Sequence, residues 1–170
     1  KKLERPPLVT LLFARLRLIL TKHSLLNSPE GKFFLQSEHD KTTKNAATFY
    51  ILPKLHKTPV KGRPIVSCSG FVTYYASVWL DHMLKPLVAK TKSFIQNSAE
   101  AVLFTVDYKF PRSCVLLSAD VESLYPSIPI EDGLLALEST LTKEQLPRAN
   151  IDFIMDIARW VLTNNYITFN

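Results

Sequence analysis

Apolar residues recur every three or four positions near the start of the chain. In residues 8–26 they stand at Leu8, Leu11, Leu12, Leu16, Ile19 and Leu20. This spacing predicts an amphipathic helix that begins after Pro6-Pro7 and has a basic outer side. The cluster Asn27, Ser28, Pro29 and Gly31 predicts a turn. The polar residues Gln36–Asn45 that follow predict an exposed loop.

The pattern then changes to one typical of strands. Thr48–Leu52 is a β-type run that ends at Pro53, and Arg63–Cys68 is a second run. The lysine-rich connection Lys54–Gly62 between them predicts a hairpin with a mobile tip. Pro64 cannot donate a hydrogen bond to a strand ladder, so we expect it at a strand start or edge.

Helical and strand patterns alternate through the rest of the chain. Helices are predicted for Tyr74–Val88, ending at Lys85-Pro86, for Ser98–Val106, for residues 130–141 and for Asn150–Thr163. The nearly continuous apolar run Ser113–Ala119 predicts a buried central strand that delivers Asp120 at its end. A last strand is predicted for Tyr166–Phe169. This order of elements implies an α+β fold.

Composition and charge narrow the class of protein. Hydrophobic residues make up 46% and charged residues 21% of the 170, which is ordinary for a globular chain and argues against a disordered one. The net charge of +6 suits a polyanionic partner, although a solvated basic surface would give the same count. No acid occurs between Asp40 and Asp81, a stretch that holds Lys54, Lys57, Lys61 and Arg63.

Several classes of site are not supported by the sequence. Cys68 and Cys114 form no CxxC pattern, so neither a zinc site nor a disulfide framework is expected. The apolar stretch Leu8–Leu20 is interrupted by Arg15 and Arg17 and is too short to span a bilayer, so we expect no membrane association. Neither end looks natural, and we expect the chain to be a fragment of an intracellular protein.

Asp120 is the main candidate for chemistry. A carboxylate at the end of a buried strand is costly unless it is paired or bound to a metal, and carboxylate oxygens suit Mg²⁺. Taken alone, such an acid is more often a helix cap or a salt-bridge partner than a metal ligand.

The residues around Asp120 carry a resemblance to a known family. The run Asp120–Pro129, DVESLYPSIP, resembles the first catalytic motif of reverse transcriptases, and most of all that of Penelope-like retroelements. Tyr50–Lys57 (YILPKLHK) and Gly62–Ser67 (GRPIVS) resemble the fingers motifs of that family in the same order. Leu80–Leu87 fits the connecting helix, and Tyr166–Asn170 resembles the strand before the next motif. Telomerase-type enzymes are the second resemblance.

The resemblance implies roles for individual residues. Asp120 would bind both Mg²⁺ ions of a nucleotidyl-transfer site, and the Val121 carbonyl would contribute to one of them. Tyr125 would lie under the sugar and disfavour a 2′-hydroxyl, although it could equally be a core residue. Arg63 would contact the incoming triphosphate, and either Lys54 or Lys57 would be the fingers lysine.

The resemblance also implies an architecture and partners. The fold would be the fingers and partial palm of a right-hand polymerase, with an N-terminal helical segment and loop (1–47), a fingers-like region (48–112) and the N-terminal part of the palm (113–170). The partners would be an RNA template, a DNA primer and deoxynucleoside triphosphates. The enzyme would reach the nucleus at some stage, although no clear localisation signal is present.

One departure from the family limits these expectations. The second catalytic motif of the family, Y-x-D-D, has no counterpart, because the chain contains no Asp-Asp pair. Two-metal chemistry needs at least one further acid, so we expect the chain alone to be inactive. Two alternatives stay open: a non-catalytic nucleic-acid-binding relic of the same fold, and an α+β domain with no nucleic-acid role.

Overall fold

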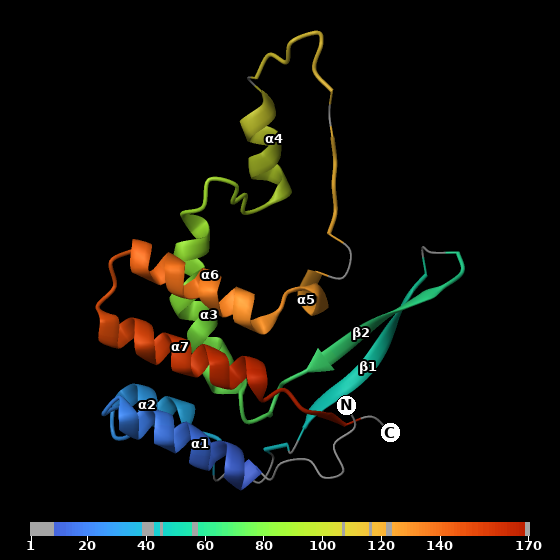
Figure 1. The fold of residues 1–170 in the computed structure, drawn as a ribbon. Helices are drawn as coiled ribbons and strands as arrows, with labels where there is room; N and C mark the ends of the chain where they lie inside the picture. Colours follow the sequence, from blue (N-terminus) through green and yellow to red (C-terminus); the bar gives the residue numbers. More distant parts are fainter. Residues whose placement is uncertain are drawn as a thin grey trace.

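The chain folds into a helical body from which a β-hairpin and a helix project in different directions (Figure 1). The structure is a computed structural model, and it describes residues 9–38, 43–44, 46–55, 58–106, 108–115, 117–121 and 124–168. Helices α1 (Val9–Lys22), α2 (Pro29–Phe34), α3 (Tyr74–Ala89), α6 (Ile130–Lys143) and α7 (Arg148–Thr163) form the body. Strands β1 (Ala47–Lys54) and β2 (Lys61–Ser67) form the hairpin, and α4 (Ser98–Val106) is the projecting helix.

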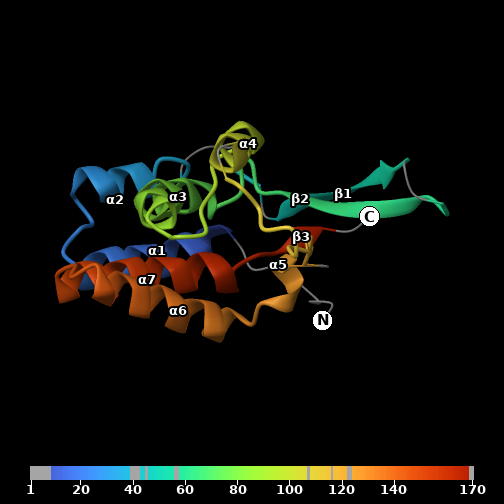
Figure 2. The same ribbon diagram turned by 90° about the horizontal axis from the view of Figure 1, so that it is seen from above.

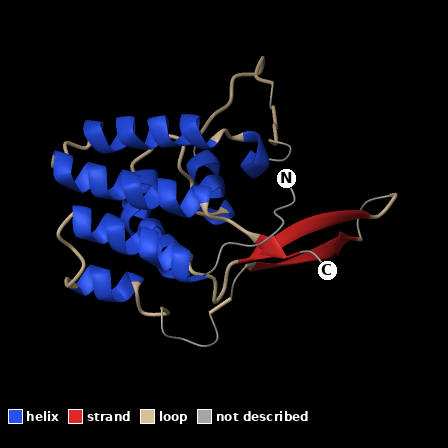
Figure 3. Cartoon of the chain, turned by 60° about the horizontal axis from the view of Figure 1, so that its bottom comes forward, coloured by secondary structure: helices blue, strands red, loops and turns tan. Residues whose placement is uncertain are grey.

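The sheet has the order β2-β1-β3 and lies to one side of the helices (Figure 3). β1 and β2 pair antiparallel from Thr48 opposite Ser67 to Lys54 opposite Lys61, whereas β3 (Ile167–Thr168) is parallel to β1 and meets only Ala47 and Thr48. Figure 2, seen from above, shows the hairpin extending beyond the helical layers. The α+β class expected from the sequence is therefore confirmed at this coarse level.

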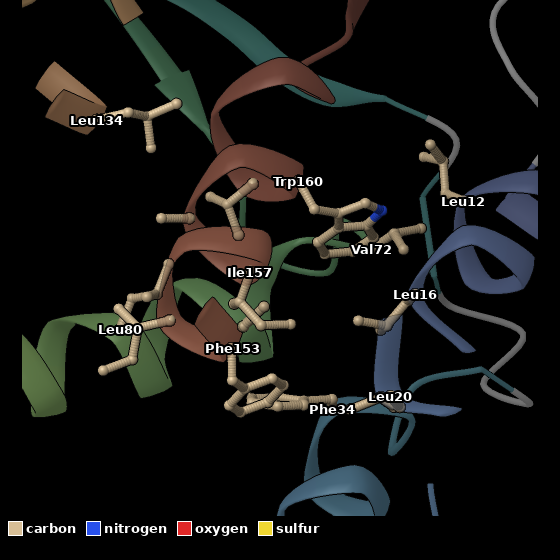
Figure 4. Close-up of a cluster of buried hydrophobic side chains, with 14 of the residues drawn as sticks. Leu12, Leu16, Leu20, Phe34, Val72, Leu80, Leu134, Phe153, Ile157 and Trp160 are labelled. Carbon is tan, nitrogen blue, oxygen red and sulfur yellow. The ribbon is translucent and has the colours of Figure 1, made fainter. Parts of the chain in front are cut away.

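The core is apolar and centres on α7. Seven of its sixteen residues are buried, at the three- and four-residue spacing of one helix face: Ile151, Phe153, Ile154, Ile157, Ala158, Trp160 and Val161. They pack against buried side chains of α1, α2, α3 and α6, including Leu16, Phe34, Leu80 and Leu134 (Figure 4). The core draws residues from all three regions expected from the sequence, and that division stays a prediction.

Most predicted elements are confirmed, with small differences at their ends. The predicted turn around Pro29 is instead the start of α2, because Ser28 caps the helix, its hydroxyl accepting from the Gly31 amide at 3.1 Å, with proline at the first position. Pro86 lies inside α3, which runs on to Ala89, and Pro53 lies inside β1. Pro64 lies in β2, an edge strand, as expected.

A lysine at the end of α1 and a histidine in the turn after it hold α1 against α7 through one carboxylate. Lys22 Nζ lies 2.6 Å and His23 Nε2 lies 2.8 Å from the same Oδ2 atom of Asp156. Burial by itself would raise the pKa of Asp156, but the hydrogen bonds from Lys22 and His23 outweigh it and hold that pKa below its ordinary value. The ionised carboxylate is therefore the form that stabilises the fold.

We expect Asp156→Asn to lower the free energy of unfolding by about 1 kcal/mol near neutral pH. The pKa is lower in the folded state, so this stabilisation is present above the unfolded value of 3.8 and is lost as the pH falls through the folded value. Urea unfolding of both proteins from pH 7 to pH 2.5 measures it, and the two curves should converge at the acid end. A difference that persists at low pH would contradict the ionic origin.

Candidate functional site

One face of the β-hairpin is basic. Residues paired across an antiparallel ladder share a face, and successive residues alternate between faces. The register pairs Leu52 with Arg63, and Lys54 with Lys61, so these four side chains lie on one face. Tyr50, paired with Ile65, lies on the same face and is 45% exposed. The structure thus brings together two predicted nucleotide-binding residues, Lys54 and Arg63.

The charges on this face are unbalanced. Lys54 and Lys61 stand directly opposite each other, and like charges in that position destabilise a strand pair. Arg63 has no hydrogen bond or ion pair with any described residue, whereas Arg17, Arg148 and Arg159 each bind a carboxylate. Uncompensated cations gathered on one face of the ladder are suited to an anionic ligand. We call Lys54, Lys61 and Arg63 the basic face.

The opposite face of the hairpin is apolar. It carries Phe49, Ile51 and Pro53 from β1, together with Gly62, Pro64 and Val66 from β2. Ile51 is 59% exposed and leans over Gly62, where an added Cβ atom would lie 2.7 Å from Ile51 Cγ2. Any larger residue at this position would therefore force the Ile51 side chain to shift.

The predicted catalytic residue lies in a segment without regular structure. Asp120 is exposed and belongs to residues 117–121, which have no strand or helix assignment. The prediction of a buried central strand before it is wrong: Val115 is 80% and Leu117 93% exposed. A buried central strand needs ladder partners and cover on both faces, and in the described part of the chain the only sheet is β2-β1-β3.

The other two predicted site residues of this motif, Val121 and Tyr125, are also exposed. Val121 is 62% exposed and follows Asp120 directly. Tyr125 lies on the short helix α5 (Leu124–Ser127) and is 89% exposed, so in this chain it is not a core residue. Lys57, the alternative fingers lysine, and His56 lie outside the described residues. No hydrogen bond or ion pair joins Asp120 to Arg63, Lys54 or Tyr125 within the described ranges.

The oxygen atoms of Asp120 and Val121 are of the right kind to bind Mg²⁺, but they are too few to form a site. A carboxylate and a backbone carbonyl are hard oxygen ligands. Among the residues that the structure describes, no group of three or more His, Cys, Asp and Glu side chains is arranged to hold a metal ion. Asp120 and Val121 could therefore contribute to such a site only together with further carboxylates.

Lys61 is a site residue that the prediction omitted. Its signal was present in the sequence, because pairing the end of the first strand-like run, Pro53, with Gly62 at the start of the second places Lys61 opposite Lys54. A separate groove of about 430 Å³ lies between α2 and α3, lined in part by Phe33, Trp79 and His82. It holds none of the predicted site residues.

Within the described ranges, no helix combines the length and apolar character needed to cross a membrane.

Comparisons with known proteins do not assign the chain to a family. No protein-family model matches the chain, and searches of curated proteins and of solved structures give no match.

Proposed function

We propose that this chain is the N-terminal part of the catalytic domain of an RNA-directed DNA polymerase of the Penelope-like type. In this proposal, the hairpin belongs to the fingers, and residues 113–170 begin the palm. The proposal rests on the three sequence motifs, taken in order, and on one structural observation, the basic face of the hairpin.

The basic face supports an anionic ligand by its electrostatics. Lys54 and Lys61 repel each other in the unliganded hairpin. A phosphate bound between them would attract both ammonium groups and offset this repulsion. The Arg63 guanidinium, which has no partner among the described residues, offers a planar donor fork for phosphate oxygens. Template, primer and nucleoside triphosphate all present such phosphates.

Asp120 and Val121 would supply part of a Mg²⁺ site in the longer protein. The metal, when bound, would lower the pKa of the primer hydroxyl and stabilise the leaving pyrophosphate. The exposed apolar run before Asp120 would gain strand partners there, because burying Val115 and Leu117 removes apolar surface from water. Tyr125 would then lie next to the bound nucleotide and disfavour a 2′-hydroxyl.

A double substitution on the hairpin tests the nucleic-acid part of this proposal. Lys54→Ala with Arg63→Ala should weaken binding of an RNA–DNA hybrid about tenfold at low salt, because two phosphate contacts are lost. The slope of log K against log salt should fall by about two. Fluorescence anisotropy across a salt series measures both quantities.

A charge-matched variant provides the control. Lys32→Ala with Lys143→Ala removes the same two charges from exposed positions on α2 and α6, and should change affinity less than threefold. Equal losses for the two variants would mean that binding depends on net charge alone and would refute the site. A non-catalytic nucleic-acid-binding relic predicts the same binding data, and the Asp120 experiment below separates it from a polymerase.

A further inference from the structure

The loop after α4 carries an exposed aromatic pair. Figure 1 shows this loop at the end of α4 farthest from the helical body. Tyr108 is 58% and Phe110 50% exposed, and their ring centroids lie 4.8 Å apart in an edge-to-face arrangement at 67°. The rings of Phe34, Trp79 and Phe153, in contrast, cluster in the core. Among the described residues, the Tyr108–Phe110 pair belongs neither to the buried core nor to the side chains packed against it, so the described core does not depend on it.

The backbone around the pair is held in place. The Tyr108 amide donates to the Thr105 carbonyl at 3.2 Å, and the Cys114 amide donates to the Pro111 carbonyl at 3.0 Å. These hydrogen bonds join the loop to the last turn of α4 on one side and close a turn on the other. Folding has therefore already restricted part of the conformational freedom that the loop would otherwise lose when it binds a ligand.

Unpaired cations alternate with the rings. Lys109 stands between Tyr108 and Phe110, and Arg112 follows Pro111. Neither cation makes a hydrogen bond or ion pair with the residues that the structure describes. Of the described arginines, Arg63 and Arg112 share this property, since Arg15 donates to Asn164 and the others bind carboxylates. The sequence 101–119 holds one acid, Asp107.

We propose that Tyr108, Lys109, Phe110 and Arg112 form a binding platform for single-stranded nucleic acid, separate from the hairpin. Bases stack on the two rings, while Lys109 and Arg112 contact the flanking phosphates. Aromatic rings interleaved with cations favour single strands over duplex, because only unpaired bases expose the faces that stack. The platform does not require polymerase activity, and it stands whether or not Asp120 is catalytic.

Binding of a labelled oligothymidylate and of a duplex of the same length tests the platform in the whole chain. The double variant Tyr108→Ala with Phe110→Ala should bind the single strand about tenfold or more weakly, because each stacked base contributes substantially to affinity. Its duplex affinity should stay within about twofold of the unaltered protein. Arg112→Ala should reduce the single-strand salt slope by about 0.7.

Two comparisons make the result decisive. Tyr74→Ala removes an aromatic ring that is 41% exposed on α3, and it should leave both affinities unchanged. Unchanged single-strand binding by the double variant, or equal losses on single strand and duplex, would overturn the proposal. So would unchanged oligonucleotide binding accompanied by weaker self-association in sedimentation, which would instead assign the exposed rings to a protein contact.

Discussion

Asp120→Asn, introduced into the polymerase proposed above, should reduce primer extension by about a thousandfold or more. The substitution keeps the size of the side chain and removes the charge that a metal ion needs. Loss of a group acting only in the transition state lowers kcat without a matching change in substrate binding. Extension of a primer on an RNA template with Mg²⁺ and deoxynucleoside triphosphates measures the effect.

The binding control separates catalysis from folding. Because Asp120 is exposed and bonded to no described residue, its substitution should leave the melting temperature and nucleic-acid affinity unchanged. Asp132→Asn, an exposed carboxylate in the first turn of α6, removes the same charge away from the motif and should retain full activity. If Asp120→Asn kept extension within tenfold of the unaltered protein, Asp120 would not be a metal ligand. A loss of binding would make it a structural residue.

Local patterns in the sequence determined the helices and the hairpin. The apolar residues of α7 from Ile151 to Val161 recur at the helical period, and this local pattern predicted the helix. The β1–β2 hairpin followed from two strand-like runs joined by a lysine-rich connection, whereas the register that places Lys54 and Arg63 on one face comes from the structure. Such features depend on residues close together in sequence.

Features that depend on distant partners could not be predicted in this way. The run before Asp120 has the composition of a buried strand, but Leu117 is exposed because the described part of the chain offers it no neighbouring strand. The composition of a segment indicates whether it is suited to a buried strand, but it does not indicate whether the fold provides a neighbouring strand. The same limit applies to Asp120, whose role depends on carboxylates that this sequence does not place beside it.

Phe34→Ala should have the largest effect on stability. Phe34 ends α2, is fully buried, and has its ring centroid 5.4 Å from that of Trp79 on α3 and 6.1 Å from that of Phe153 on α7. Truncation removes the ring and leaves a cavity among three helices, which costs about 3–5 kcal/mol. Since a domain of this size is stable by about 5–15 kcal/mol, the loss is a large share of the total.

Urea unfolding followed by tryptophan fluorescence measures this loss, because Trp79 lies against the altered site. Phe34→Leu, which keeps most of the volume, should cost about 1.5 kcal/mol or less. Phe94→Ala, which removes a ring that is 41% exposed, should change stability by about 0.5 kcal/mol at most. The hairpin depends on the same core, because the Ala47 amide at the base of β1 donates to the Tyr166 carbonyl at 2.7 Å, just after α7. When urea unfolds the core of Phe34→Ala, nucleic-acid binding through the basic face should therefore be lost at the same urea concentration. A cost below 1 kcal/mol for Phe34→Ala would mean that α2 does not pack on α3 and α7 in solution.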